Sequence, residues 1–273
     1  MTEKEIWSKI IYEANSILES ERLSGSYIKK FVTDFDKLSE VIAFKISNDL
    51  ADKDANEIFS IDFIFSELKE VFENEKIING LVLDLHAVKQ RDPAASGYLP
   101  TLLFSKGFLA LQTHRASNYF LNSKESLMAS FLHSQSSKLY GVDIHPAASI
   151  GVGVMLDHAT GIVIGETSVI EDDVSIFQGV TLGGTGKVTG DRHPKVRQGV
   201  LISAGAKILG NVEIGQGAKV AAGSVVLDNV EMNTTVAGVP AVAVGKPSSD
   251  SPAITVDHTI CLLYTSDAAD ERR

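Results

Sequence analysis

The sequence predicts an α+β protein, in which an N-terminal all-helical domain is followed by a left-handed parallel β-helix of hexapeptide repeats. Two observations lead to this prediction: apolar residues recur at helical spacing in the first half, and from Ile144 their period changes to six. A period of six fits neither a helix nor one long alternating strand, and it is the signature of a hexapeptide β-helix. We therefore expect a helical domain at 1–140, a β-helix at 141–245 and an irregular tail at 246–273.

The helical domain is predicted from caps, apolar stripes and one proline. Thr2 followed by Glu5 fits a capping box, and apolar residues at helical spacing follow it. A second stripe runs from Ile61 to Phe72, with Glu and Lys on the opposite face. Because the residue before a proline disfavours the α region, the segment 91–94 (Arg-Asp-Pro-Ala) should end a helix. Further helices are expected near 26–50, 77–90, 100–121 and 124–139.

The β-helix is predicted from two runs of positions spaced by six residues. These positions are Ile144, Ile150, Leu156, Ile162, Ser168, Val174 and Val180, then Val200, Ala206, Val212, Ala218, Ser224, Val230 and Val236. All but two of them are aliphatic, counting Ala, so we expect them to point into the prism. Each hexad would form a short strand and a corner, and neighbouring coils would pair at about 4.8 Å. Such prisms are left-handed, which is an exception to the usual crossover rule.

The repeat is interrupted between Val180 and Val200, where we place a loop at 184–199. The loop is rich in glycine and basic in a chain that is otherwise acidic. Its basic residues are Lys187, Arg192, Lys195 and Arg197. A loop that leaves a regular solenoid is where functional residues tend to lie.

Composition excludes several classes of function. The formal net charge of −10 argues against a nucleic-acid surface, because phosphate binding needs clustered Lys and Arg. No apolar run approaches the roughly 20 residues of a membrane span, and the N-terminus lacks the apolar core of a signal peptide. Cys261 is the only cysteine, so no intrachain disulfide or cysteine-based metal cluster is possible. We expect a cytoplasmic protein that binds neither nucleic acid nor membrane.

Three histidines stand out as candidates for chemistry. Four others are interpreted as packed or solvated, because they lie in helical sequence or in the tail: His86, His114, His133 and His258. The three candidates lie in or beside the β-helix: His145, His158 and His193.

Asp143 and His158 are fifteen residues apart, close to the length of one coil of three hexads. They should therefore lie on adjacent layers, where a carboxylate can orient an imidazole for general-base removal of a hydroxyl proton. Asp157 and Arg192 add charges of both signs, which an amino-acid zwitterion would require, and arginine binds a carboxylate through two hydrogen bonds.

The motifs around these residues resemble those of the serine acetyltransferases of bacterial and plant cysteine biosynthesis. In the β-helix the similar strings are DIHPAASIG (143–151), MLDHATGIVIGET (155–167), VTLGGTGK (180–187), GDRHPKV (190–196), AGAKILGNVEIG (204–215) and AGVPAVAVGKP (237–247). Upstream, AVKQRDPAA (87–95) and LLFSKGFLALQTHR (102–115) resemble the family's helical domain. The resemblance is strong over about 80–247, and over 1–79 it extends mainly to size and helicity.

The resemblance implies direct transfer of acetyl from acetyl-CoA to the hydroxyl of L-serine, giving O-acetylserine and CoA in the first step of cysteine biosynthesis. His158 would be the general base, Asp143 would support it, and His193 would steady the oxyanion. Serine would be bound by Asp92, Asp157, Arg192 and His193. Acetyl-CoA, as co-substrate, would contact Gly184, Thr185, Ala204, Gly205, Lys219 and Ala222 along the prism edge. No metal and no tightly bound cofactor is implied.

The resemblance also implies an assembly and a regulator. The β-helices would form a trimer, the helical domains would join two trimers into a hexamer, and the loop histidine would serve a neighbouring subunit. L-cysteine would inhibit by binding in the serine site. The family's tail commonly ends in Ile and inserts into O-acetylserine sulfhydrylase, whereas this chain ends in TICLLYTSDAADERR. We therefore interpret residues from about 261 as non-native, and no sulfhydrylase partnership is expected from this tail.

Three other functions compete with this interpretation. A hexapeptide acyltransferase acting on a sugar or xenobiotic hydroxyl would share the prism and the catalytic histidine, but it would lack the helical serine site at Asp92 and Pro93. A zinc hydratase of the γ-carbonic anhydrase type would use three histidines such as His145, His158 and His193 as ligands. The third alternative is a non-enzymatic trimerisation scaffold.

Overall fold

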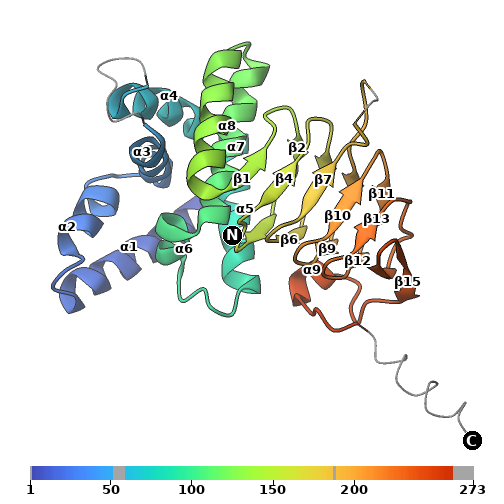
Figure 1. The fold of residues 1–273 in the computed structure, drawn as a ribbon. Coiled ribbons are helices and arrows are strands. Elements are labelled where there is room, and N and C mark those ends of the chain that lie inside the picture. The colour runs from blue at the N-terminus through green and yellow to red at the C-terminus, as the bar shows by residue number, and fades with distance from the viewer. Residues whose placement is uncertain (1, 52–58, 187–188, 261–273) are drawn as a thin grey trace, which may run out of the picture. The chain divides into compact units, whose positions relative to one another are not determined.

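A computed structural model describes residues 2–51, 59–186 and 189–260. The chain divides into two compact units, Met1–Ala147 and Ala148–Arg273 (Figure 1). Three sequence predictions lie outside the described residues: the basic residue Lys187, Cys261, and the non-native tail from about 261. In the described part of the chain, no helix is long and apolar enough to cross a membrane.

The first unit is helical, as the sequence predicts. Its helices are α1 (Glu3–Ser20), α2 (Gly25–Ile28), the π-helical turn η1 (Lys29–Thr33), α3 (Leu38–Leu50), α4 (Ile61–Glu73), α5 (Glu75–Arg91), α6 (Tyr98–Phe104), α7 (Lys106–Asn122) and α8 (Ser126–Tyr140), followed by strand β1 (Val142–Ile144). The capping box of α1 is confirmed: the Glu5 amide donates to Thr2 Oγ1 and the Thr2 amide donates to the Glu5 carboxylate. Helix α5 ends at Arg91, directly before Asp92 and Pro93, also as predicted.

Two of the predicted helical stretches are broken in the structure. The stretch 26–50 divides into α2, η1 and α3, and the stretch 100–121 divides at Ser105 into α6 and α7. The Ser105 hydroxyl accepts a hydrogen bond from the amide of Phe108 and so caps the start of α7. Apolar spacing continues across both breaks, which is why periodicity alone does not detect them.

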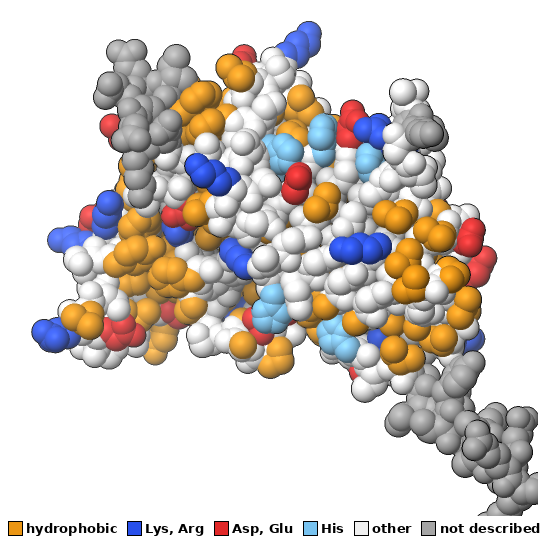
Figure 2. Space-filling model, viewed as in Figure 1, with side chains coloured by type: hydrophobic (Ala, Val, Ile, Leu, Met, Phe, Trp, Pro, Cys, Tyr) orange, Lys and Arg blue, Asp and Glu red, His pale blue; other side chains and the backbone are white. Residues whose placement is uncertain are grey.

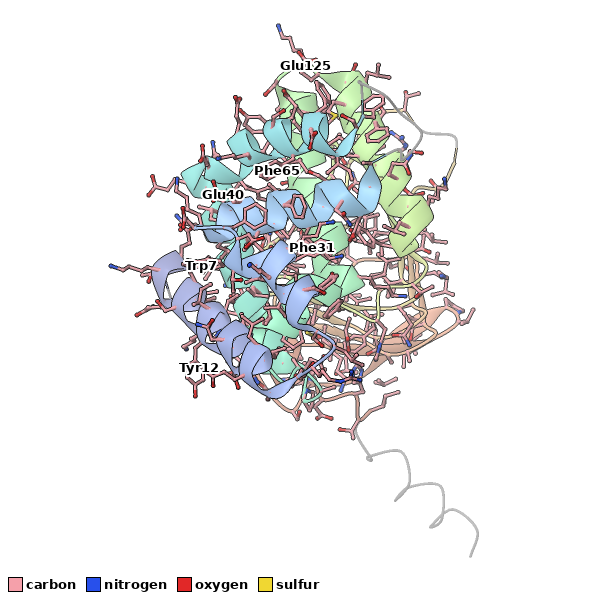
Figure 3. The ribbon with its side chains drawn as sticks, turned by 90° about the vertical axis from the view of Figure 1, so that its left-hand side faces the viewer. Trp7, Tyr12, Phe31, Glu40, Phe65 and Glu125 are labelled. Carbon is pink, nitrogen blue, oxygen red and sulfur yellow. The ribbon has the colours of Figure 1, made fainter. Side chains whose placement is uncertain are left out.

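The helical unit has an aromatic cluster and a buried polar cluster. The ring of Phe44 lies 5.3 Å from that of Phe31 and 5.7 Å from that of Phe65, measured between centroids. Phe31 and Phe65 are labelled in Figure 3. Nearby, Lys45 Nζ donates to both carboxylate oxygens of Asp49, at 2.7 and 2.6 Å, and the Tyr140 hydroxyl donates to the same carboxylate at 3.0 Å. This polar cluster connects α3 to the last turn of α8.

The second unit is a parallel β-helix with the left-handed fold that the sequence predicts (Figure 1). Its strands are β2 (Ser149–Ile150), β3 (Met155–Asp157), β4 (Ile162–Ile164), β5 (Val169–Ile170), β6 (Ser175–Phe177), β7 (Thr181–Gly183), β8 (Lys195–Val196), β9 (Leu201–Ile202), β10 (Lys207–Leu209), β11 (Glu213–Ile214), β12 (Lys219–Val220), β13 (Val225–Val226), β14 (Thr235–Gly238) and β15 (Ala241–Gly245), with a short helix α9 (Pro252–Thr255) after them. They stack on three faces, ordered β4-β7-β10-β13, β2-β5-β8-β11 and β3-β6-β9-β12-β14, with β15 antiparallel to β14.

The predicted inward positions form the core of the prism. All of them are buried except Ile150, which is half-buried. The structure adds a second inward residue to most hexads, two positions further along, as in the ladder Ile176–Ile202–Val220 across paired strands. This second position follows from strand geometry, because residues i and i+2 face the same side of a strand.

The loop in the structure is shorter than its predicted limits of 184–199. Strand β8 (Lys195–Val196) already belongs to the solenoid, because it pairs in parallel with both β5 and β11. The Val196 side chain is fully buried in the prism. Among the described residues, those outside the solenoid are therefore 184–186 and 189–194. The sequence places 195–199 in the loop because the count of six resumes only at Val200.

Candidate active site

His158 lies at the corner between β3 and β4, in a turn with unusual backbone geometry. Both His158 (φ 55°) and Ala159 (φ 58°) occupy the left-handed region, which residues other than Gly, Asn and Asp rarely adopt. The Asp157 carboxylate supports this turn, since its Oδ1 accepts the His158 amide at 2.8 Å. The His158 side chain is 71% exposed, and its Nε2 lies 3.7 Å from Asp157 Oδ2.

Asp143, the predicted partner of His158, contacts a histidine of the helical unit. Its Oδ1 lies 2.7 Å from Nε2 of His133, a residue of α8 that the sequence analysis interpreted as packed or solvated. The carboxylate is about half exposed. His145, two residues further along, accepts the Ala147 amide at Nδ1, at 3.1 Å.

Asp92, the predicted serine ligand ahead of the repeats, is the C-cap residue of α5. Its amide donates to the Val88 carbonyl, and its Oδ1 accepts the amide of Ala94 at 2.7 Å. The aspartate and the following proline thus form a tight turn that fixes the carboxylate on the backbone.

His193 is held in the loop by Thr167, a residue of the corner between β4 and β5. The backbone amide of Thr167 donates to His193 Nδ1 at 3.1 Å, and Thr167 Oγ1 lies 2.9 Å from the same nitrogen. His193 is nearly fully buried. The ring packs so closely on Gly165 that a Cβ at that position would overlap its Cδ2 and Nε2 atoms, and Gly184 lies near Nε2 as well.

Arg192 and Lys195 fix the loop to the same corner. The Arg192 guanidinium donates to the Glu166 carboxylate at 2.7 Å and to the Gly190 carbonyl at 3.1 Å. Lys195 Nζ donates to the carbonyl oxygens of Thr167 and His193, each at 2.8 Å, and to the carboxylate of Asp191. The hydrogen bond from Lys195 lowers the pKa of Asp191. Two of the basic residues predicted in the loop, Arg192 and Lys195, therefore anchor it to the β4–β5 corner.

Within the second unit, His158 and His193 leave the prism at different corners. His158 precedes β4, whereas Thr167 and the loop that it holds follow β4. A three-residue strand spans about 10 Å, so one strand separates the two corners.

The residues predicted to contact CoA also lie at different places on the prism. Gly184 and Thr185 lie at the start of the loop, after β7. Ala204, Gly205 and Ala222 lie on the corner that carries His158, where the amides of Gly179, Gly205 and Gly223 each donate to the coil before. Lys219 lies on β12, and its Nζ donates to the Thr259 carbonyl of the tail at 2.7 Å.

The sequence analysis missed three residues of the β4–β5 corner that hold the loop, Gly165, Glu166 and Thr167, and separately the contact of His133 with Asp143 in the helical unit. The first three lie within the quoted string MLDHATGIVIGET, so a resemblance marked the segment but not these contacts. Histidines are spread over the face shown in Figure 2, yet among the described residues no group of three or more His, Cys, Asp or Glu is placed to hold a metal ion.

Comparisons with known proteins identify the family and the fold of the chain. A family profile described as "Serine acetyltransferase, N-terminal" matches residues 6–113, and one described as "Bacterial transferase hexapeptide (six repeats)" matches residues 193–228. The serine acetyltransferase of Salmonella typhimurium is 48% identical over 253 residues, which cover 92% of this chain and 91% of that protein.

Two solved structures are similar over nearly the whole chain. A serine acetyltransferase in complex with cysteine is 44% identical with a TM-score of 0.91, covering 95% of this chain and 100% of the other. A serine acetyltransferase of Brucella abortus in complex with coenzyme A is 46% identical with a TM-score of 0.85, covering 89% and 96%. On the evidence of sequence identity, coverage and fold, this chain belongs to the serine acetyltransferase family.

Proposed function

We propose that this acyltransferase moves the acetyl group of acetyl-CoA to the hydroxyl of L-serine, with His158 as the general base. The observation that carries the proposal is the strained turn that presents an exposed imidazole beside a carboxylate. Backbone strain of this kind persists where the surrounding structure maintains it, and it concentrates at functional sites.

In this mechanism His158 removes the proton of the serine hydroxyl, and the serine oxygen attacks the thioester carbonyl carbon. The tetrahedral intermediate collapses with cleavage of the C–S bond, and the CoA sulfur leaves with the proton that His158 took from serine. Asp143 supports His158, and a hydrogen bond from His193 stabilises the oxyanion. Asp92, Asp157 and Arg192 bind the serine.

The separation of His158 and His193 supports a site that is completed by a neighbouring subunit. Because the two histidines leave one prism at different corners, a trimer that brings one corner against the other would unite them. We therefore propose a trimer of β-helices, and a hexamer in which helical domains 1–140 join two trimers. The enzyme would act in the cytoplasm.

CoA would bind along the corner of small residues, Ala204, Gly205 and Ala222, with Gly184, Thr185 and Lys219 contributing to its site. The coenzyme A complex of the Brucella abortus protein supports CoA as the product. The cysteine complex supports L-cysteine as an inhibitor that resembles serine and competes for its site.

The test is release of CoA from acetyl-CoA and L-serine by wild-type protein and by His158→Gln. Loss of a general base is expected to lower kcat by about 10²- to 10⁴-fold while the oligomer persists. His145→Asn is the matched control, since a zinc site would need that residue and the acyl transfer does not. Full activity of His158→Gln, or a far higher rate on a sugar hydroxyl than on serine, would contradict the proposal.

A further inference from the structure

The hydrogen bonds around His193 Nδ1 determine which of its nitrogens carries the proton. The Thr167 backbone amide donates to Nδ1 at 3.1 Å, and a backbone N–H can act only as a donor. Nδ1 must therefore be the unprotonated nitrogen of a neutral imidazole, and Nε2 must carry the hydrogen. The partner on one nitrogen thus sets the chemistry of the other.

The hydroxyl of Thr167 makes the arrangement self-consistent. Its Oγ1 accepts the amide of Arg192 at 3.0 Å and the amide of His193 at 3.1 Å. With both lone pairs used, the hydroxyl hydrogen is free to be donated, and Nδ1 lies 2.9 Å away. The Asp191 carboxylate is a second acceptor within reach of the same hydroxyl. In either case Nδ1 still faces the Thr167 amide.

The neighbours of Thr167 stabilise the same geometry from both sides. Lys195 Nζ bridges the carbonyls of Thr167 and His193, and Glu166 holds the side chain of Arg192. Gly165 supports the Nε2 edge of the ring, where any side chain would displace it. The β4–β5 corner therefore fixes the position of the loop residues Arg192 and His193.

We propose that Thr167 is a positioning residue for acyl transfer, which fixes His193 as the Nε2–H tautomer and so directs a hydrogen-bond donor at the reacting group. The inference rests on the role proposed above for His193. A donor aimed in advance at the developing oxyanion needs no rearrangement during the reaction, which is the basis of oxyanion stabilisation.

The first measurement is the tautomer itself, which does not depend on activity. In protein labelled with ¹⁵N-histidine, the His193 signals, assigned with His193→Gln, are expected to show an unprotonated Nδ1 and a protonated Nε2. Thr167→Val keeps the shape of the side chain and the backbone amide but removes the acceptor for two loop amides, so the His193 ring should move away from that amide. The variant should move these signals towards a mixture of tautomers.

The second measurement is kinetic. Thr167→Val is expected to lower kcat/KM for serine by roughly ten- to a hundredfold, mainly through kcat, because loop hydrogen bonds are lost and the donor is misaligned. Thr167→Ser, which keeps the hydroxyl, should restore the rate. Thr234→Val is the matched control, since its hydroxyl donates only to the Met232 carbonyl in the described structure, away from the loop.

Each outcome decides the proposal. It is overturned if wild-type His193 is protonated at Nδ1, if Thr167→Val lowers the rate with unchanged His193 signals, or if Thr167→Ser is as slow as Thr167→Val. An unchanged rate and unchanged signals in Thr167→Val would also overturn it. Failure of the wild-type protein to acetylate serine would instead reject the proposed function, because the tautomer is measured without turnover.

Discussion

At the scale of single residues, the turn at His158 has an energetic cost, and it presents the imidazole to solvent. Two consecutive non-glycine residues in the left-handed region each cost about 1–2 kcal/mol relative to ordinary backbone. The Asp157 carboxylate offsets part of this cost by accepting the His158 amide. Asp157 therefore has a backbone role in addition to the contact with serine proposed for it.

Gly165 gives a direct test of how tightly His193 is placed. In Gly165→Ala the added methyl would overlap the Cδ2 and Nε2 atoms of His193, so the ring must move. We expect kcat/KM to fall by about tenfold or more while the β-helix stays folded, because a misplaced group loses its orientation. Steady-state kinetics and circular dichroism measure the two effects.

Gly25→Ala is the control for this substitution, because a Cβ at Gly25 meets only Leu18 at 3.7 Å, an ordinary contact. Equal activity of Gly165→Ala and wild-type protein would show that the ring tolerates displacement.

The site could be predicted from the sequence only where residues are close along the chain or match a known motif. The sequence singles out His158, Arg192 and His193 in this way, by motif and by the break in the repeat. Thr167 could not be found, because its contact to His193 joins positions twenty-six residues apart and depends on how the loop folds back. The same holds for His133, whose contact to Asp143 depends on the packing of α8.

At the scale of elements, the hexads show how a short repeat makes a stable core. Strands of only two or three residues could not be stable alone, but each pairs with a neighbouring coil, and strands such as β7 and β9 pair with a coil on both sides. The period of six was visible because every coil must present an apolar side chain at the same place. The breaks in the helices were invisible because a cap such as Ser105 leaves the apolar spacing unchanged.

Helices α3 and α8 are connected by a hydrogen bond whose strength should depend on pH. Burial raises the pKa of Tyr140 well above its usual value of 10, and Asp49 adds to this effect. The folded-state pKa is raised, so the stabilisation is fully present below pH 10 and is lost as the pH rises above it. Urea unfolding between pH 8 and about 11 should show wild-type protein losing its advantage over Tyr140→Phe.

Tyr12→Phe is the control for this substitution, because the Tyr12 side chain is 77% exposed. A constant difference in unfolding free energy between wild-type protein and Tyr140→Phe over this pH range would contradict the prediction.

At the scale of the whole molecule, the proposed sharing of the site between subunits predicts complementation. His158→Gln subunits keep the loop, and His193→Gln subunits keep the base. In any mixed trimer, one of the three interfaces joins an intact base to an intact loop, so about one third of the wild-type activity should return. The measurement is the rate of mixed oligomers isolated by two different affinity tags after coexpression.

If base and loop served the same chain, every subunit in the mixture would carry one defect and activity would stay at the level of the separate variants. The mixture therefore distinguishes a shared site from an internal one, whichever residues bind serine.

The antiparallel strand β15 has a consequence for solubility. A parallel solenoid ends in a coil whose amide and carbonyl groups could recruit another strand, and such open edges promote aggregation. On one face the chain turns back on itself, and β15 pairs with β14 across a change of register between Thr235 and Val236. An irregular, reversed strand is a poor template for another parallel coil. Strand β15 thus covers the edge of β14 at the end of the prism, which discourages end-to-end growth into fibres.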